Sequence, residues 1–127
     1  MPQVIKILVI DDDPSVLLST VCYLEDEGYE VISAESAEAG LAMLEDGTVN
    51  VAVVDMRLPG MDGNDFIRAA SKVDKDLKYI VLTGSAQYAI PTDVAELGVA
   101  NAQVLKKPLI EMNKITDEIK RLLDRSE

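Results

Sequence analysis

Apolar runs alternate with segments of helical periodicity five times along this chain, and this alternation limits the possible folds more than any other feature of the sequence. Most of the runs are rich in valine, isoleucine and leucine, as expected for strands that are buried on both faces. The strands are predicted at residues 4–10, 29–33, 50–54, 78–82 and 102–106. Five βα units of this kind predict a parallel sheet covered by helices on both faces, with right-handed crossovers.

The intervening segments carry the signals that start and stop helices. The five helices are predicted to cover roughly residues 14–27, 37–45, 63–72, 91–97 and 109–125. Asp13 is expected to be the N-cap of the first helix, with Pro14 at its first position, and Ser36 is expected to cap the second. Pro91 delays the fourth helix, which is therefore expected to be short and to follow a long loop.

Composition excludes several classes of protein. The length of 127 residues suits one domain, expected to span residues 1–127, and the net charge of −11 argues against direct binding of nucleic acid. No apolar run is long enough to cross a membrane, and Lys6 interrupts the first one before it reaches signal-peptide length. The absence of histidine excludes histidine-ligated zinc and histidine general bases. The single cysteine, Cys22, is expected to be a buried inert thiol in a cytoplasmic protein.

Polar residues follow four of the predicted strands. Asp11, Asp12 and Asp13 follow the first strand, Asp55 the third, Thr83 the fourth and Lys107 the fifth. Since the carboxyl ends of parallel strands lie at one edge of the sheet, these side chains are expected to meet there. Carboxylates gathered in this way suit Mg²⁺, with Asp12 and Asp55 as direct ligands and Asp11 binding directly or through water. Asp13 is better explained as the helix cap.

The same residues suit phosphoryl transfer. A carboxylate can act as a nucleophile toward phosphorus, and the reaction needs a cation on the transferring oxygens. Lys107 and Mg²⁺ supply positive charge, and the hydroxyl of Thr83 can donate a hydrogen bond to a phosphoryl oxygen. Taken singly, the acids are equally well explained as a solvated acidic turn, and Lys107 and Thr83 are better explained as a surface lysine and a strand threonine. Together they favour a site for phosphoryl transfer.

Four sequence motifs together resemble those of a known family. They are ILVIDDD at Ile7 to Asp13, VVDMRLPGMDG at Val53 to Gly63, VLTG at Val81 to Gly84, and KKP at Lys106 to Pro108. In order and spacing the whole chain resembles the receiver domain of two-component response regulators, including the chemotaxis regulators. The stretch from Asp55 through PGMDG is the specific part, whereas an acidic pair alone is weak.

The resemblance implies a flavodoxin-like (βα)5 three-layer fold with strand order 2-1-3-4-5. It implies that Asp55 accepts a phosphoryl group from a histidine kinase or histidine phosphotransfer protein, and that the domain catalyses only its own phosphorylation and dephosphorylation. Asp11, Asp12, Asp55 and the backbone carbonyl of Arg57 would hold Mg²⁺, while Thr83 and Lys107 would contact the phosphoryl group. The signal would pass to a downstream effector or output domain, or to a homodimer, through the face formed by the fourth helix, fifth strand and fifth helix.

The chain departs from the family pattern in the part that reports phosphorylation. Receivers usually carry an aromatic residue three positions before the lysine of the Lys-Pro pair, and Val104 stands there instead. Tyr88, in the long loop before Pro91, is either a substitute aromatic or a half-buried loop tyrosine. The side chain of Arg57 either overhangs the site and tunes the lifetime of the acyl phosphate or faces solvent.

Two other classes compete with the phosphorylated receiver. One is a small haloacid-dehalogenase-like phosphohydrolase, in which Asp11 and Asp13 would form the D-x-D pair, followed by Thr83 and Lys107. That class would leave Asp55 unexplained, and no acidic pair follows Lys107 at a strand end. The other is a receiver-like interaction domain that is never phosphorylated.

Overall fold

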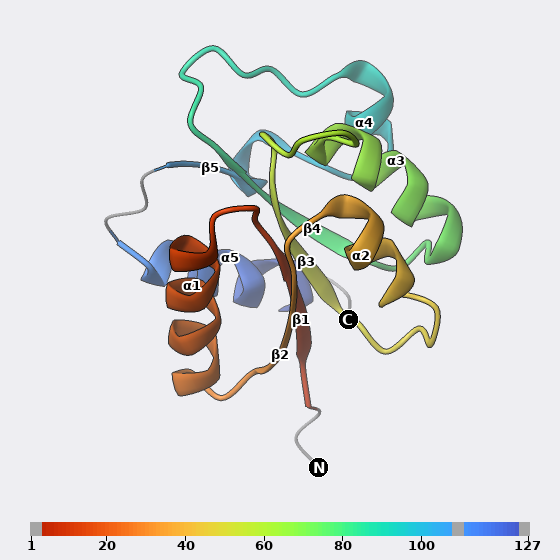
Figure 1. Cartoon of the computed structure of the whole chain (residues 1–127). Coiled ribbons are helices and arrows are strands. Elements are labelled where there is room, and N and C mark those ends of the chain that lie inside the picture. Colours follow the sequence, from red (N-terminus) through yellow and green to blue (C-terminus); the bar gives the residue numbers. More distant parts are fainter. Residues whose placement is uncertain (1–3, 108–110, 125–127) are drawn as a thin grey trace.

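The computed structural model describes residues 4–107 and 111–124. Its strands form a single five-stranded sheet of order β2-β1-β3-β4-β5, in which every pairing is parallel (Figure 1). They are β1 (Lys6–Ile10), β2 (Glu30–Ala34), β3 (Val51–Asp55), β4 (Lys78–Thr83) and β5 (Val104–Lys106). The flavodoxin-like order 2-1-3-4-5 is confirmed, and each strand lies within two residues of its predicted position.

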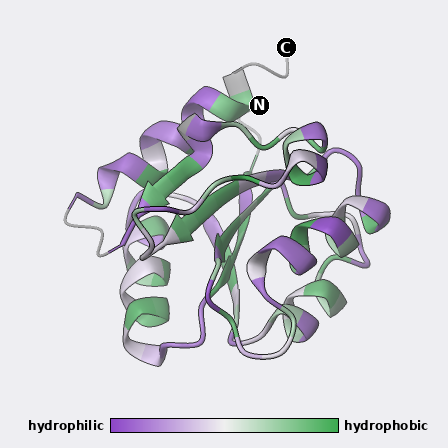
Figure 2. Cartoon of the chain, turned by 90° about the horizontal axis from the view of Figure 1, so that it is seen from above, coloured by the Kyte–Doolittle hydropathy of each residue, from purple (hydrophilic) through white to green (hydrophobic). Residues whose placement is uncertain are grey.

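The helices cover both faces of the sheet and complete three layers (Figure 1). They are α1 (Pro14–Asp26), α2 (Ala37–Ala42), α3 (Gly63–Val73), α4 (Thr92–Glu96) and α5 (Asn113–Asp124). Alternate strand residues point to opposite faces, so Ile7 and Val9 pack under α1 and α5 while Leu8 and Ile10 pack under α2, α3 and α4. Seen from above, the apolar residues concentrate on the sheet and on the helix faces turned toward it (Figure 2).

Three helices begin where side-chain caps satisfy their first free N–H groups. Asp13 accepts hydrogen bonds from the N–H groups of Ser15 and Val16, as predicted, and Ser36 caps α2. Asp62 and Asp65 form a reciprocal capping box at the start of α3. These caps fix the points at which the chain leaves the carboxyl edge of the sheet. The Asp13 cap follows Asp11 and Asp12 directly, and the Asp62 cap closes the loop that follows Asp55.

The structure corrects several boundaries. Helix α2 ends at Ala42 rather than near residue 45, because the N–H groups of Met43 and Leu44 bond to carbonyls three residues back in tight turns. Strand β5 begins at Val104 because a 3-10 turn occupies Asn101–Gln103. Helix α5 begins at Asn113, and the part of its prediction that covers residues 109 and 110 lies outside the described residues, as does Pro108.

Cys22 was expected to be buried and is exposed. Its helix buries Leu17, Thr20 and Leu24, so Cys22 falls on the opposite, solvent-facing side. The apolar neighbours of Cys22 in the sequence suggested burial, but the helical period decides which face a residue occupies. Among the described residues no helix is long and apolar enough to span a bilayer.

Candidate functional site

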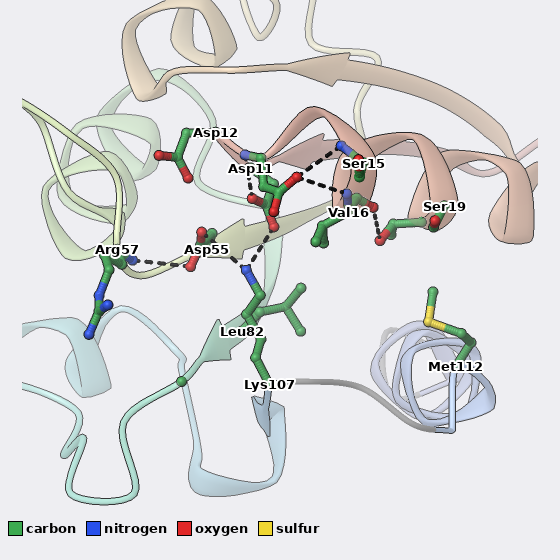
Figure 3. A pocket seen from close by; sticks show the side chains of 13 residues that line it. Asp11, Asp12, Ser15, Val16, Ser19, Asp55, Arg57, Leu82, Lys107 and Met112 are labelled. Carbon is green, nitrogen blue, oxygen red and sulfur yellow. Dashed lines mark hydrogen bonds and ion pairs between the residues drawn. The ribbon is translucent and has the colours of Figure 1, made fainter.

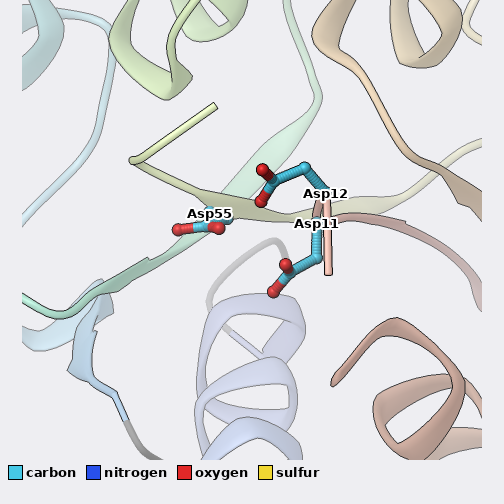
Figure 4. Close-up of side chains that lie close together, drawn as sticks. All are labelled: Asp11, Asp12 and Asp55. Carbon is cyan, nitrogen blue, oxygen red and sulfur yellow. The ribbon is translucent and has the colours of Figure 1, made fainter. Parts of the chain in front are cut away.

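Three aspartates meet at the carboxyl edge of the sheet. Asp11 and Asp12 follow β1, and Asp55 is the last residue of the adjacent strand β3. One carboxylate oxygen from each lies within 4.8 Å of the others, and Figure 4 shows the three carboxylates converging. Asp11 and Asp55 are only 1% and 4% exposed, whereas Asp12 is exposed. The predicted gathering of acids from two strands is therefore present.

Backbone N–H groups hold the two buried carboxylates in place. Asp11 accepts a hydrogen bond from the N–H of Asp13 at 2.9 Å, and Asp55 accepts one from the N–H of Arg57 at 3.1 Å. Each aspartate thus uses its Oδ1 to close the turn that follows its own strand. The second oxygen, Oδ2, remains directed into the site.

Lys107 joins these two carboxylates. Its Nζ lies 3.0 Å from Oδ2 of Asp11 and 3.3 Å from Oδ2 of Asp55 (Figure 3). Its backbone N–H donates to the carbonyl of Thr83 at 2.8 Å, which fixes the chain that leaves β5 against the end of β4. A residue 52 positions from Asp55 and 96 from Asp11 therefore bridges both, as the parallel topology predicted.

The electrostatics of the site favour added positive charge. Burial and the neighbouring Asp11 raise the pKa of Asp55, although the N–H of Arg57 and the ammonium of Lys107 oppose the rise. The pKa of Lys107 is raised, because the hydrogen bond and charge of Asp11 and then Asp55 outweigh the effect of burial. The three clustered carboxylates thus have one ammonium among them, and it pairs with Asp11 and Asp55 only. A hard cation coordinated by carboxylate oxygens would relieve this imbalance, so Asp11, Asp12 and Asp55 form a donor set that fits Mg²⁺.

Thr83 and Arg57 lie at the same edge of the sheet. Thr83 is 3% exposed, and its Oγ1 accepts a hydrogen bond from the N–H of Ser85 at 3.1 Å. Its hydroxyl is therefore engaged with the following loop. Arg57 contributes its backbone N–H to Asp55, while its exposed side chain extends away from the three carboxylates (Figure 3).

A cleft of 660 Å³ opens above these residues and continues along the first half of α1. Besides the acids and Lys107, its wall includes Ser15, Val16 and Ser19 of α1, and Met112 just before α5 (Figure 3). The sequence motifs did not identify this extension. The only signal for it was the helical spacing that places positions 15 and 19 on one side of α1.

Asp13 lines the same cleft but is not one of the three clustered acids, and its Oδ1 caps α1. This capping role argues against the D-x-D pair that the phosphohydrolase hypothesis required. The remaining arrangement, a parallel α/β sandwich with two buried acids and a lysine at its carboxyl edge, is that of a flavodoxin-like domain built around an anionic site. Residues 7–120 match the family model of the response regulator receiver domain, and the chain belongs to this family. It is a signalling family, as the motifs predicted.

Known proteins agree with this assignment in sequence and in structure. The chain is 30% identical over 118 residues to the response regulator receiver protein CpdR of Brucella abortus, an alignment covering 93% of this chain and 96% of that protein. It is 35% identical to a CheY-like receiver domain protein of Methanospirillum hungatei, with a TM-score of 0.80 and coverage of 97% and 96%. A receiver domain from Clostridium thermocellum gives a TM-score of 0.85 at 28% identity, with 97% of each chain covered.

Other relatives carry a similar segment within much longer chains. The transcriptional regulatory protein GlrR of Escherichia coli is 35% identical over 103 residues, which is 81% of this chain but 23% of GlrR. The sensor kinase CckA of Brucella abortus is 29% identical over 127 aligned positions, covering 95% of this chain but 13% of CckA. The chain thus spans about a quarter or less of these two proteins and nearly all of CpdR.

Proposed function

We propose that this receiver domain accepts a phosphoryl group on Asp55 from the phosphohistidine of a histidine kinase or phosphotransfer protein, and that phosphorylation changes which partner it binds. The observation that carries the proposal is the position of Asp55. Its Oδ1 is fixed by the N–H of Arg57, while its Oδ2 lies 3.3 Å from Lys107 and faces the cleft. A carboxylate held in this way is a preorganised nucleophile beside a cation.

In the proposed step an oxygen of Asp55 attacks the phosphorus of the phosphohistidine. The new P–O bond forms as the P–N bond breaks, and the imidazole leaves with the electron pair and takes up a proton. Lys107 would exchange its bond to Asp55 for one to a phosphoryl oxygen while it keeps Asp11, so that its charge remains in the site. Water later cleaves the acyl phosphate and restores the carboxylate.

Asp11, Asp12, Asp55 and the backbone carbonyl of Arg57 are the proposed ligands of Mg²⁺. When bound, the ion would neutralise charge on the transferring phosphoryl oxygens. The chain's own part is to hold the carboxylates within 4.8 Å of one another, so that loading needs no rearrangement of β1 or β3. Thr83 would turn its hydroxyl from Ser85 toward the phosphoryl group and report its arrival.

The proposed phosphodonor approaches through the cleft beside α1. The cleft connects Asp55 to the polar side chains of Ser15 and Ser19, and the neighbouring Leu18 is 65% exposed. Such a mixed polar and apolar rim suits a protein surface that carries a phosphohistidine. The family relationship supports the cytoplasm as the setting. It also supports an output or homodimer surface formed by α4, β5 and α5, while the acidity of the chain disfavours direct nucleic-acid contact.

Arg57 lines the cleft two residues beyond Asp55, and its side chain, which here extends away from the carboxylates, is proposed to fold over the acyl phosphate and tune its lifetime. Replacing it in Arg57→Ala is expected to speed hydrolysis a few-fold by admitting water. Loss of the phosphoryl mass would be followed after the phosphodonor is removed. A hydrolysis rate equal to that of the wild type would assign Arg57 to the solvent-facing surface only.

The decisive experiment incubates the protein with Mg²⁺ and acetyl phosphate and measures its intact mass. Wild type is expected to gain the mass of one phosphoryl group, and Asp55→Asn to gain none. Omitting Mg²⁺ should greatly reduce the gain. No gain in the wild type, or the same gain in Asp55→Asn, would leave a receiver-like interaction domain that is never phosphorylated as the better description.

A further inference from the structure

The segment between β4 and α4 carries no regular structure, yet side chains tie it to the rest of the molecule. It leaves Thr83 at the end of β4, arches above the sheet and reaches α4 beside α3 (Figure 1). Helix α4 has five residues, and Pro91 at its N-cap makes no side-chain cap bond. A helix this short has little stability of its own. Its position is therefore set by tertiary contacts.

Tyr88 makes the central contact of this segment. Its hydroxyl donates a hydrogen bond to Oδ1 of Asn64, the second residue of α3, at 2.8 Å, and its ring packs against the apolar cluster beneath α2, α3 and α4. Burial raises the pKa of the Tyr88 phenol, so the group remains a hydrogen-bond donor. Val104 packs against the same cluster, but its side chain has no polar atom with which to make such a bond.

One end of this hydrogen bond is packed against Asp55, and the other follows the chain from Thr83. On the α3 side, Gly63 precedes Asn64 and packs so closely that an added Cβ would lie 2.8 Å from the carbonyl oxygen of Asp55 and 2.9 Å from the Cα of Met56. The start of α3 is thus seated on the backbone of the phosphoacceptor. On the loop side, the chain runs from Thr83, whose Oγ1 accepts the N–H of Ser85, to Tyr88.

The hydroxyl of Thr83 cannot turn toward Asp55 without weakening its bond to Ser85. Of the described residues, those that line the cleft include Leu82 and Gly84 but not Thr83, whose side chain is buried beside the loop. Rotation toward the cleft leaves the N–H of the exposed Ser85 without this acceptor, so the loop loses a bond that fixes its start to the end of β4. Lys106 also holds this stretch, donating to the carbonyls of Ser85 and Ala86.

From these connections we propose that the Tyr88–Asn64 hydrogen bond is the conformational switch of this domain, in place of an aromatic residue on β5. Turning Thr83 toward a phosphoryl group on Asp55 moves the loop that begins at Ser85, withdraws Tyr88 from Asn64 and frees α4 from α3. The inference rests on the proposed phosphorylation of Asp55 and adds the element that carries the signal. It requires two discrete arrangements of one segment, with Asp55 biasing the equilibrium between them.

Amide hydrogen exchange over residues 84–97, read by mass spectrometry with and without Mg²⁺ and acetyl phosphate, tests the switch. In wild type, exchange of this segment is expected to rise about fivefold on phosphorylation, the effect of losing one net hydrogen bond. In Tyr88→Phe, which removes only the hydroxyl, exchange should already be raised and should not rise further. Asn64→Ala should behave in the same way. Tyr29→Phe, at a half-buried tyrosine on the opposite face, is the matched control and should behave as wild type.

Intact mass measured on the same samples separates the two proposals. If the mass shows phosphorylation but exchange over residues 84–97 stays unchanged in the wild type, the switch is wrong and the phosphoacceptor stands. Wild-type exchange in both Tyr88→Phe and Asn64→Ala would also overturn it. If no phosphoryl mass is gained at all, the proposed function fails and this inference falls with it. Circular dichroism of each variant establishes that altered exchange does not reflect global unfolding.

Discussion

The acid–lysine edge and the segment between β4 and α4 lie at the same end of the sheet but are held in place in different ways. At the edge, Asp11 and Asp55 each accept an N–H two residues further along, immediately after a buried strand. In the segment between β4 and α4, Tyr88 is held by a hydrogen bond to Asn64, which lies 24 residues away in the sequence. Local turns on a rigid sheet give a chemical site little freedom. A segment held by a few separate side-chain contacts can adopt more than one position, which suits a part of the molecule that transmits a signal.

The comparison predicts that the largest losses of activity come from the edge. Lys107→Ala removes the ammonium shared by Asp11 and Asp55, and phosphorylation by acetyl phosphate is expected to slow by about 10²–10³-fold, the usual cost of losing one preorganised charge donor. The rate would be followed by intact mass. Lys106→Ala is the matched control, because that neighbouring lysine contacts loop carbonyls instead. Equal rates in the two variants would contradict the role given to Lys107.

Metal binding gives the next largest effect. Mg²⁺ that binds only the folded protein raises the free energy of unfolding by about 2.7 kcal/mol at one hundred times its dissociation constant. Urea unfolding with and without Mg²⁺ should show this gain in wild type and a much smaller gain in Asp12→Asn. Asp13→Asn is the control, since asparagine preserves the cap of α1 and Asp13 lies outside the cluster. A full Mg²⁺ effect in Asp12→Asn would remove Asp12 from the ligand set.

Without bound metal, the buried carboxylate of Asp55 is expected to lower the free energy of unfolding. The pKa of Asp55 is raised above its ordinary value of 3.8 in the folded protein, first by burial, so the folded state binds a proton more readily than the unfolded state. The penalty is absent at low pH and grows as the pH rises from 3.8 through the raised pKa of the folded state. In chelator, Asp55→Asn should therefore be more stable than wild type at pH 7, because the neutral amide avoids burying a charge.

The pH profile makes this prediction specific. The advantage of Asp55→Asn should shrink as the pH falls toward 3.8, where the wild-type carboxyl also becomes neutral. Glu38→Gln, an exposed site on α2, should show little difference from wild type at either pH. A variant at position 55 that is less stable than wild type at pH 7, or equally stabilised at both pH values, would mean that burial does not strain this carboxylate.

The sequence predicted most of the fold and the composition of the edge, and the reason is topological. Buried parallel strands are marked by their apolar runs, and their carboxyl ends must share one edge, so Asp11, Asp12, Asp55 and Lys107 could be brought together without coordinates. Contacts between surface side chains carry no such periodic mark. The pairing of Tyr88 with Asn64 depends on the path of an irregular loop. The exposure of Cys22 depends on which side of α1 faces the sheet.

The smallest effect on stability is expected at the exposed ion pair between α3 and α4. Arg68 of α3 makes two hydrogen bonds to Asp93 of α4, at 2.6 and 3.2 Å, but both side chains are exposed. Exposed ion pairs contribute little, so Arg68→Ala should lower the free energy of unfolding only slightly, and the loss should shrink in high salt. Val94→Ala, at a fully buried residue of α4, should cost about 2 kcal/mol regardless of salt. A larger loss in Arg68→Ala would mean that the ion pair, rather than core packing with the Tyr88 bond, holds α4 against α3.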